Sequence, residues 1–143
     1  MLDVAIVGGG PGGMAAGRSL AAAGWSVTVF EEHPQIGTPV HCTGVLAEDV
    51  ITELNLPAEA VLNPLSTVRF IAPAGHSFDY TTASTEAVVI DRAVFDDALG
   101  RSAEIAGAAI VRGRRVIAID TSSASAPVSF ADSEPVVARS VVL

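Results

Sequence analysis

The sequence predicts an α/β protein that begins with a Rossmann-type βαβ unit. Two apolar runs, Val4–Val7 and Val27–Phe30, have the length of buried parallel strands. A glycine cluster opens the segment that joins them, and an acidic residue, Glu31, ends the second run. This combination is typical of a dinucleotide-binding turn. We therefore expect a parallel sheet with a nucleotide site at its first strand-to-helix corner.

Each glycine of the motif Gly8-x-Gly10-x-x-Gly13 has a separate predicted role. Gly8 permits the tight turn, Gly10 lets the backbone approach a pyrophosphate, and Gly13 lets the helix pack closely on the strand. The helix N-terminus attracts an anion through unpaired amides and its dipole, so no basic side chain is needed. Glu31 would accept hydrogen bonds from a ribose diol and repel a 2′-phosphate. A glycine-rich turn without a ligand is the alternative.

Length and composition narrow the class of protein. The chain has 143 residues, about one domain, and its 50% hydrophobic and 17% charged residues argue against disorder. Its 8 basic and 16 acidic residues leave a net charge of −8, which argues against nucleic-acid binding. An acidic Asp3 near the start and interrupted apolar runs predict neither a signal peptide nor a membrane-spanning helix, and hence a cytoplasmic location.

The cysteine and histidine residues predict no metal site. Cys42 is the single cysteine, so no internal disulfide or cysteine-rich metal centre is expected. His33 and His76 lack metal-ligand spacing with each other or with Cys42, and His41 is interpreted as a solvated loop residue rather than a proton donor. Cys42 itself is either a small buried side chain or part of a ligand site.

The middle of the chain is predicted to leave the parallel sheet. Residues 32–45 are rich in Pro and Gly and form a loop after the second strand, where open α/β sheets bind ligands. Residues 46–54 have the apolar spacing of a short helix. Val68–Ile71 and Ser77–Thr81 alternate with period two around a turn and predict a hairpin, and residues 86–90 predict another strand.

The last third of the chain is predicted to return to the sheet. Asp91 caps a helix with Asp96 and Asp97 on a solvated face, and residues 108–111 form a parallel strand. Three apolar runs then predict an antiparallel meander, with a loop at 121–126: Val116–Ile119, Val128–Phe130 and Val136–Leu143. Because the chain stops inside the last run, we expect a fragment, or one half of a split protein, truncated at the C-terminus.

Three blocks of this sequence can be compared with a known family: the glycine turn with Glu31, the loop Gly37-x-Pro39-Val40-x-Cys42-x-Gly44, and Asp91-Arg92-x-x-Phe95-Asp96-x-x-Leu99 followed by Gly107-Ala108. Together they resemble the geranylgeranyl reductase family of FAD-dependent oxidoreductases, within the wider group typified by p-hydroxybenzoate hydroxylase. The resemblance covers the whole chain but only the N-terminal part of the family's length. It implies one incomplete FAD-binding domain over residues 1–143, with the hairpin region 65–90 on the substrate-domain side.

The resemblance also implies a cofactor, a reaction and a set of site residues. Reduced FAD would deliver a hydride to isoprenoid double bonds of a lipid, with NAD(P)H or ferredoxin as electron donor, and the complete enzyme would meet a membrane surface. Cys42 is the one candidate catalytic residue. The family's FAD contacts carry over to Gly8, Gly10, Pro11, Gly12 and Gly13 at the diphosphate, Glu31 at the ribose, Val116 near the adenine, and Cys42, Thr43, Gly44, Val45 and Arg92 on the flavin side.

Other functions stay open at this point. A flavin monooxygenase or halogenase of the same wider group would use the same cofactor site. A non-catalytic nucleotide-binding module or split subunit would act only with a partner chain that supplies the family's missing Ala-Asp-Gly-type motif and substrate domain. Because half of the flavin site is absent, we expect this chain alone to bind FAD weakly and to be inactive. Arg92 either faces the cofactor or pairs with Asp96 one helical turn on.

Overall fold

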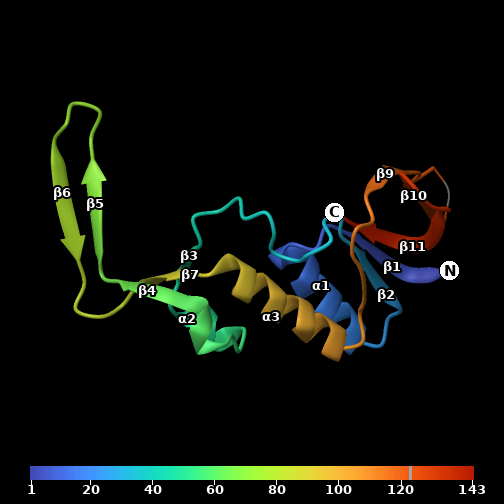
Figure 1. The fold of residues 1–143 in the computed structure, drawn as a ribbon, viewed down its shortest axis with the longest axis horizontal. Helices are drawn as coiled ribbons and strands as arrows, with labels where there is room; N and C mark the ends of the chain where they lie inside the picture. The colour runs from blue at the N-terminus through green and yellow to red at the C-terminus, as the bar shows by residue number, and fades with distance from the viewer. Residues whose placement is uncertain (123) are drawn as a thin grey trace. The chain divides into compact units, whose positions relative to one another are not determined.

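The structure is a computed structural model that describes residues 1–122 and 124–143, so one residue of the predicted loop 121–126 lies outside the described residues. The chain divides into two compact units. Unit 1 comprises residues 1–39 and 96–143, and unit 2 comprises residues 40–95. Within the described residues the strands form a six-stranded sheet in unit 1, and a three-stranded and a two-stranded sheet in unit 2 (Figure 1).

The predicted βαβ start is confirmed. β1 (Leu2–Val7) is followed by α1 (Pro11–Ala22) and β2 (Val27–Phe30), and the two strands pair in parallel. All four residues of β2 are buried, as expected of a strand that is covered on both faces. Pro11 lies in the first turn of α1, where its missing N–H removes no intrahelical hydrogen bond.

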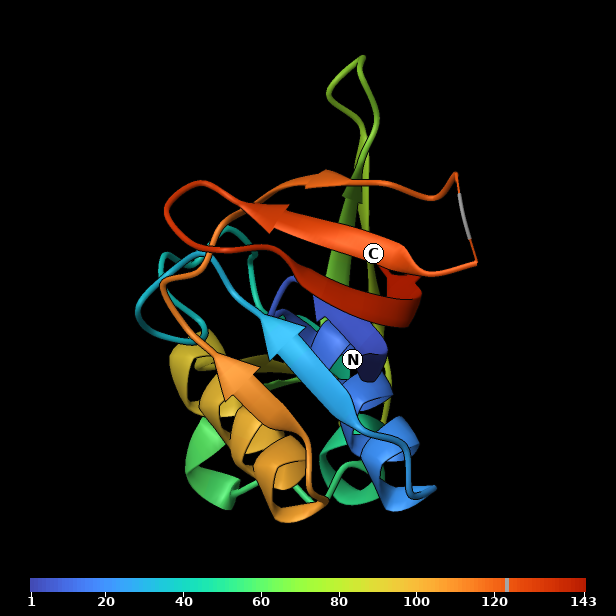
Figure 2. The same ribbon diagram turned by 90° about the vertical axis from the view of Figure 1, so that its right-hand side faces the viewer.

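The six-stranded sheet unites the predicted parallel strands and the predicted meander. Its order is β8-β2-β1-β11-β10-β9. β8 (Ala109–Val111) pairs in parallel with β2, while β9 (Val116–Ile119), β10 (Ala126–Phe130) and β11 (Val136–Val142) are antiparallel neighbours. β11 also pairs in parallel with β1, which makes one sheet of the two parts. Figure 2 shows the meander strands at one end of this sheet and β2 with β8 at the other.

The core of unit 1 joins β2 to the meander. Phe30 of β2 and Phe130 of β10 lie with ring centroids 4.8 Å apart and planes tilted by 54°, a favourable arrangement for an aromatic pair. Both side chains are buried. The cluster around them consists of Ala5, Phe30, Val128, Phe130 and Ala138. Burial of Phe30 therefore depends on the return of the chain in β10.

Unit 2 contains a small sheet around β7 (Ala87–Ile90), which pairs antiparallel with β3 (Val45–Ala47) and with β4 (Val61–Leu65). The helix predicted over residues 46–54 is wrong in its first part, because residues 45–47 pair with β7. Helix α2 covers only Asp49–Glu53, and a 3₁₀ turn follows at Ala58–Ala60. β4 is a strand that the pattern did not predict, because it contains Pro64. An edge strand tolerates proline, and β4 lies at an edge.

The predicted hairpin is confirmed. β5 (Thr67–Ile71) and β6 (Ser77–Thr81) pair antiparallel and form a long two-stranded ribbon (Figure 1). Phe70 and Phe78 face each other across the strands and stack with centroids 4.9 Å apart, although both are exposed. The proposed place of this hairpin on the substrate-domain side stays a prediction.

Helix α3 (Arg92–Ile105) begins as predicted. The Oδ1 atom of Asp91 accepts hydrogen bonds from two backbone amides of the first turn, at 2.9 and 3.2 Å, as an N-cap does. The solvated face predicted for Asp96 is wrong, because Asp96 is 4% exposed. Asp97 is half-exposed and pairs with Arg101 one turn on, at 2.7 Å. None of the helices in the described ranges combines the length and apolar character needed to cross a bilayer.

Candidate nucleotide site

The corner between β1 and α1 has the geometry that the glycine motif predicts. Gly8 has φ +100°, a conformation that residues with a Cβ rarely adopt. A Cβ at Gly13 would lie 2.0 Å from the carbonyl oxygen of Gly8, so only glycine fits there. A Cβ at Gly10 or Gly12 would meet nothing within 4 Å. The first amides of α1 therefore adjoin open space, and they have no intrahelical acceptors.

Glu31, directly after β2, turns back onto this corner. Its Oε2 accepts a hydrogen bond from the amide of Gly9 at 2.6 Å, and its Oε1 accepts one from the amide of His33 at 2.8 Å. The ring Nδ1 of His33 lies 2.6 Å from the same Oε1. Burial by itself would raise the pKa of Glu31, but these hydrogen bonds outweigh it and hold the pKa below the ordinary value of 4.5. The carboxylate is therefore ionised at neutral pH.

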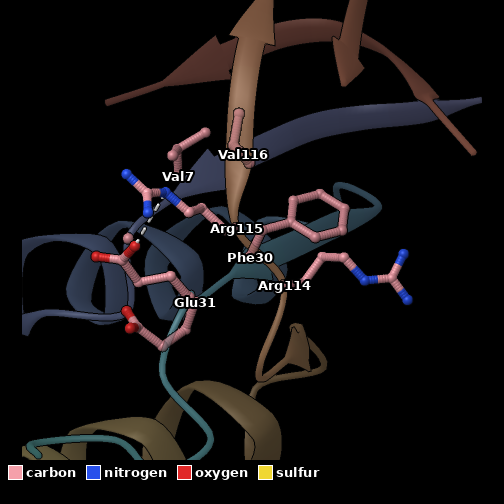
Figure 3. Close-up of a pocket in the computed structure, with 8 residues that line it drawn as sticks. Val7, Phe30, Glu31, Arg114, Arg115 and Val116 are labelled. Carbon is pink, nitrogen blue, oxygen red and sulfur yellow. Dashed lines mark ion pairs between the residues drawn. The ribbon is translucent and has the colours of Figure 1, made fainter. Parts of the chain in front are cut away.

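A cavity of about 260 Å³ opens beside this carboxylate. Glu31 and Val116, which lie far apart in the sequence, line it together (Figure 3). The lining comprises Val7, Gly8, Phe30, Glu31, Glu32, Arg114, Arg115 and Val116. The ends of β1 and β2 and the start of β9 thus enclose a space next to the glycine turn.

Two arginines that the sequence patterns do not single out belong to this cavity. The Nε atom of Arg115 lies 3.5 Å from a carboxylate oxygen of Glu32, in an exposed ion pair. Arg114 points away from Glu31 in Figure 3, and its guanidinium lies 5.3 Å from the ring centroid of Phe130. The amide of Arg114 donates a hydrogen bond to the carbonyl oxygen of Glu31 at 2.8 Å. This bond connects the segment just before β9 to the end of β2. In the sequence, only the position of Arg114 and Arg115 directly before the Val116 strand indicates that they lie near the site.

The candidates for the flavin side gather in unit 2. Gly44 has φ +70°, and a Cβ there would lie 2.8 Å from the carbonyl oxygen of Ile90. Its amide donates to the Sγ of Cys42 at 3.5 Å. This hydrogen bond, aided by Arg92 and Thr43, outweighs partial desolvation and lowers the pKa of the Cys42 thiol. Cys42 is exposed, so the interpretation of it as a small buried side chain is wrong.

The predicted site residues therefore fall into two local groups. Unit 1 holds Gly8, Gly10, Pro11, Gly12, Gly13, Glu31 and Val116, and unit 2 holds Cys42, Thr43, Gly44, Val45 and Arg92. Val45 lies at the start of β3, opposite Val89 of β7. Among the described residues, no three His, Cys, Asp or Glu side chains come together as they would around a metal ion.

The parallel sheet, the glycine corner and the acidic residue beyond β2 define a Rossmann-type dinucleotide-binding domain. A family model described as an NAD(P)-binding Rossmann-like domain matches residues 6–63. The digeranylgeranylglycerophospholipid reductase of Methanosphaerula palustris is 35% identical over 120 residues, which are 81% of this chain and 30% of that protein. The reductase of the same name from Methanospirillum hungatei is 36% identical over 122 residues, or 82% of this chain and 30% of that protein.

A solved structure of a similarly named protein also matches this chain. The crystal structure of a geranylgeranyl bacteriochlorophyll reductase-like protein from Thermoplasma acidophilum matches 98% of this chain and 38% of that chain, with a TM-score of 0.81 and 27% identity. The chain is therefore related to the geranylgeranyl reductase family, as its motifs indicate. It spans about 30% of the length of the curated relatives it matches.

The fold is also shared outside these reductases. The structure of halogenase PltM in complex with phloroglucinol and FAD matches 98% of this chain and 33% of that chain, with a TM-score of 0.75. Sequence identity is 17%, so this similarity concerns the fold alone.

Proposed function

We propose that this chain is the FAD-binding part of a flavin-dependent oxidoreductase. Together with the rest of the family's fold, it would reduce isoprenoid double bonds of a lipid. The observation that carries the proposal is the corner where the amides of the glycine turn, the ionised Glu31 and the adjoining cavity meet. The names of the curated relatives support the reaction class and the lipid substrate.

The residues of unit 1 fit the ADP half of FAD. Gly10 and Gly12 leave space in which phosphate oxygens would approach the first amides of α1. Glu31 would hold the ribose, and the backbone of Val116 would contact the adenine in the shared cavity. The carboxylate of Glu31 repels a 2′-phosphate, which favours FAD over NADP as the resident nucleotide.

The residues of unit 2 would serve the flavin end. FAD, when bound, supplies the hydride chemistry, and the protein holds and orients it. Arg92 would bring positive charge to that end of the site, and the lowered thiol pKa of Cys42 makes it the candidate for a direct part in the reaction. Thr43, Gly44 and Val45 would contact the flavin beside it. NAD(P)H or ferredoxin would supply electrons to the complete cytoplasmic enzyme at a membrane surface.

The test is the affinity of the chain for FAD, measured by the change in flavin fluorescence on titration. Gly10→Val places a side chain in the open space at the first amides of α1 without a backbone clash, so binding should weaken at least about tenfold. Ala15→Val adds the same methyl groups on the exposed side of α1 and should bind as the parent does. Equal affinities of the Gly10→Val variant and the parent would reject the site.

A second proposal concerns the part of the fold that these 143 residues do not contain. Because they span about 30% of the relatives' length, we propose that activity needs the remaining part, either in the same polypeptide or in a partner chain. Alone, this chain should bind FAD weakly and catalyse no reduction. Purification of the chain with stoichiometric yellow cofactor would contradict this.

An oxygen-using reaction is the alternative within the same fold, which halogenase PltM shares. The reconstituted complex distinguishes the two reactions. A reductase saturates the isoprenoid double bond without oxygen, whereas a monooxygenase or halogenase modifies an aromatic or lipid substrate only when oxygen is present. Oxygen-dependent product formation would defeat the reductase proposal.

A further inference from the structure

Among the described residues, three hydrogen bonds hold the carboxylate of Glu31, and His33 makes two of them. Its amide donates to Oε1 at 2.8 Å, and its ring Nδ1 lies 2.6 Å from the same oxygen. The amide of Gly9 donates to Oε2 at 2.6 Å. Because an ionised carboxylate only accepts hydrogen bonds, Nδ1 of His33 must carry the proton in this contact. The ring is 41% exposed, so it is a surface side chain directed onto one carboxylate oxygen.

The remaining acceptor capacity of Glu31 limits what a ligand can find there. A carboxylate offers about four acceptor positions, two on each oxygen. Among the described residues, His33 takes both positions on Oε1, and Gly9 takes one of the two on Oε2. One position on Oε2 is left for a hydroxyl group. A ribose diol brings two hydroxyl donors, so Glu31 held in this way accepts only one of them.

We propose that His33 is a positioning residue that fixes Glu31 so that Oε2 accepts a single hydroxyl of the adenosine ribose. The inference rests on the proposed function and refines it, because it replaces recognition of the diol by recognition of one hydroxyl. A carboxylate held from two sides has little rotational freedom to lose when the nucleotide binds, which favours affinity. Without the imidazole, Oε1 loses its ring donor, and the side chain is held less firmly against Gly9.

The contact itself is tested without ligand. In ¹⁵N NMR spectra of the chain, at a pH where the ring is neutral, His33 should carry its proton on Nδ1. Glu31→Leu removes the acceptor, and the ring should then shift towards the Nε2–H tautomer that free histidine prefers. An Nε2–H tautomer of His33 in the parent would overturn the proposal before any nucleotide is added.

The effect on recognition is measured with ADP, 2′-deoxy-ADP and 3′-deoxy-ADP, by NMR shift titration of backbone amides. In the parent, one deoxy analogue should bind roughly tenfold more weakly than ADP, and the other within about twofold. His33→Leu should weaken ADP binding roughly fivefold and reduce the preference between the analogues. His33→Asn should restore both, because its side-chain nitrogen can donate from the place of Nδ1. His76→Leu, in the hairpin turn, is the control and should change neither.

The outcomes separate the inference from the proposed function. ADP binding by His33→Leu that is as tight as in the parent, or tighter, means that the imidazole does not assist Glu31. Equal weakening of both deoxy analogues in the parent means that Glu31 takes the whole diol. If ADP leaves the amides of Gly8–Gly13 unshifted in the parent, the proposed nucleotide site is itself rejected, and the ribose role of His33 with it.

Discussion

Replacement of Gly13 by alanine should destabilise the protein because the added methyl group has no room. A Cβ there would lie 2.0 Å from the carbonyl oxygen of Gly8, whereas real Cβ contacts essentially never fall below 3.0 Å. The obstacle is backbone, so α1 must move away from β1. Overpacking of this kind costs about 1–3 kcal/mol. Alanine's better helix propensity returns at most about 1 kcal/mol. We expect the free energy of unfolding to fall by about 1–2 kcal/mol.

Gly12→Ala is the matched control. Gly12 precedes Gly13 in the same turn of α1, is exposed, and has nothing within 4 Å of an added Cβ. Its replacement should leave stability unchanged or raise it by up to about 1 kcal/mol. Urea unfolding followed by circular dichroism gives both values from the midpoint and slope. Unfolding free energies of the two variants that agree within about 0.5 kcal/mol would refute the close packing inferred for the glycine motif.

Charges and backbone conformation elsewhere give three more expected results. The pKa of Glu31 in the folded protein lies below its ordinary value of 4.5. The hydrogen bonds to its carboxylate therefore stabilise the fold fully above pH 4.5, and this stabilisation is lost as the pH falls through the folded-state pKa. Glu31→Gln should therefore flatten the acid limb of stability against pH, and an unaltered limb would count against these contacts. The pKa of the Cys42 thiol lies below 9.0, so the rate of Cys42 alkylation by iodoacetamide should reach half its maximum at a pH below 9.0. A midpoint at pH 9.0 or above would be inconsistent with the hydrogen bond from the Gly44 amide. Gly44→Ala combines a positive φ with a Cβ placed 2.8 Å from the carbonyl of Ile90 and should cost about 1–3 kcal/mol in urea unfolding. Gly75→Ala has a similar φ in open space, so equal losses in the two variants would show that crowding at Gly44 adds nothing.

The βαβ unit was predictable because all of its signals are local. One short stretch contains the apolar runs of β1 and β2, the spaced glycines and the acidic Glu31. The position of each follows from the local geometry of a strand–turn–helix–strand unit. Asp91 as an N-cap and the hairpin of β5 and β6 were predictable for the same reason. Their geometry depends on neighbours in the sequence.

The errors arose where a distant partner decided the local structure. Residues 46–54 have helical apolar spacing, but residues 45–47 pair with β7, whose backbone supplies the hydrogen bonds of a strand. β4, which contains Pro64, forms because it pairs with β7 as an edge strand of the small sheet, and an edge strand tolerates proline. Asp96 looks like a surface residue from its charge, and only packing shows that it is buried. Pairing and burial of this kind leave no periodic signal in the segment itself.

The cavity beside Glu31 shows how far the site depends on the last third of the chain. The glycine turn alone would supply the proposed phosphate-binding corner, but a nucleotide also needs walls for its adenosine. Those walls form because β11 pairs with β1 and so places the meander beside the parallel strands. Phe130 then packs on Phe30, with ring centroids 4.8 Å apart. The amide of Arg114 then hydrogen-bonds the carbonyl of Glu31 and places the start of β9 over the cavity. This backbone hydrogen bond joins Glu31, the proposed ribose ligand, to the start of β9, the proposed adenine contact, so disturbance of β9 should weaken binding of the adenosine.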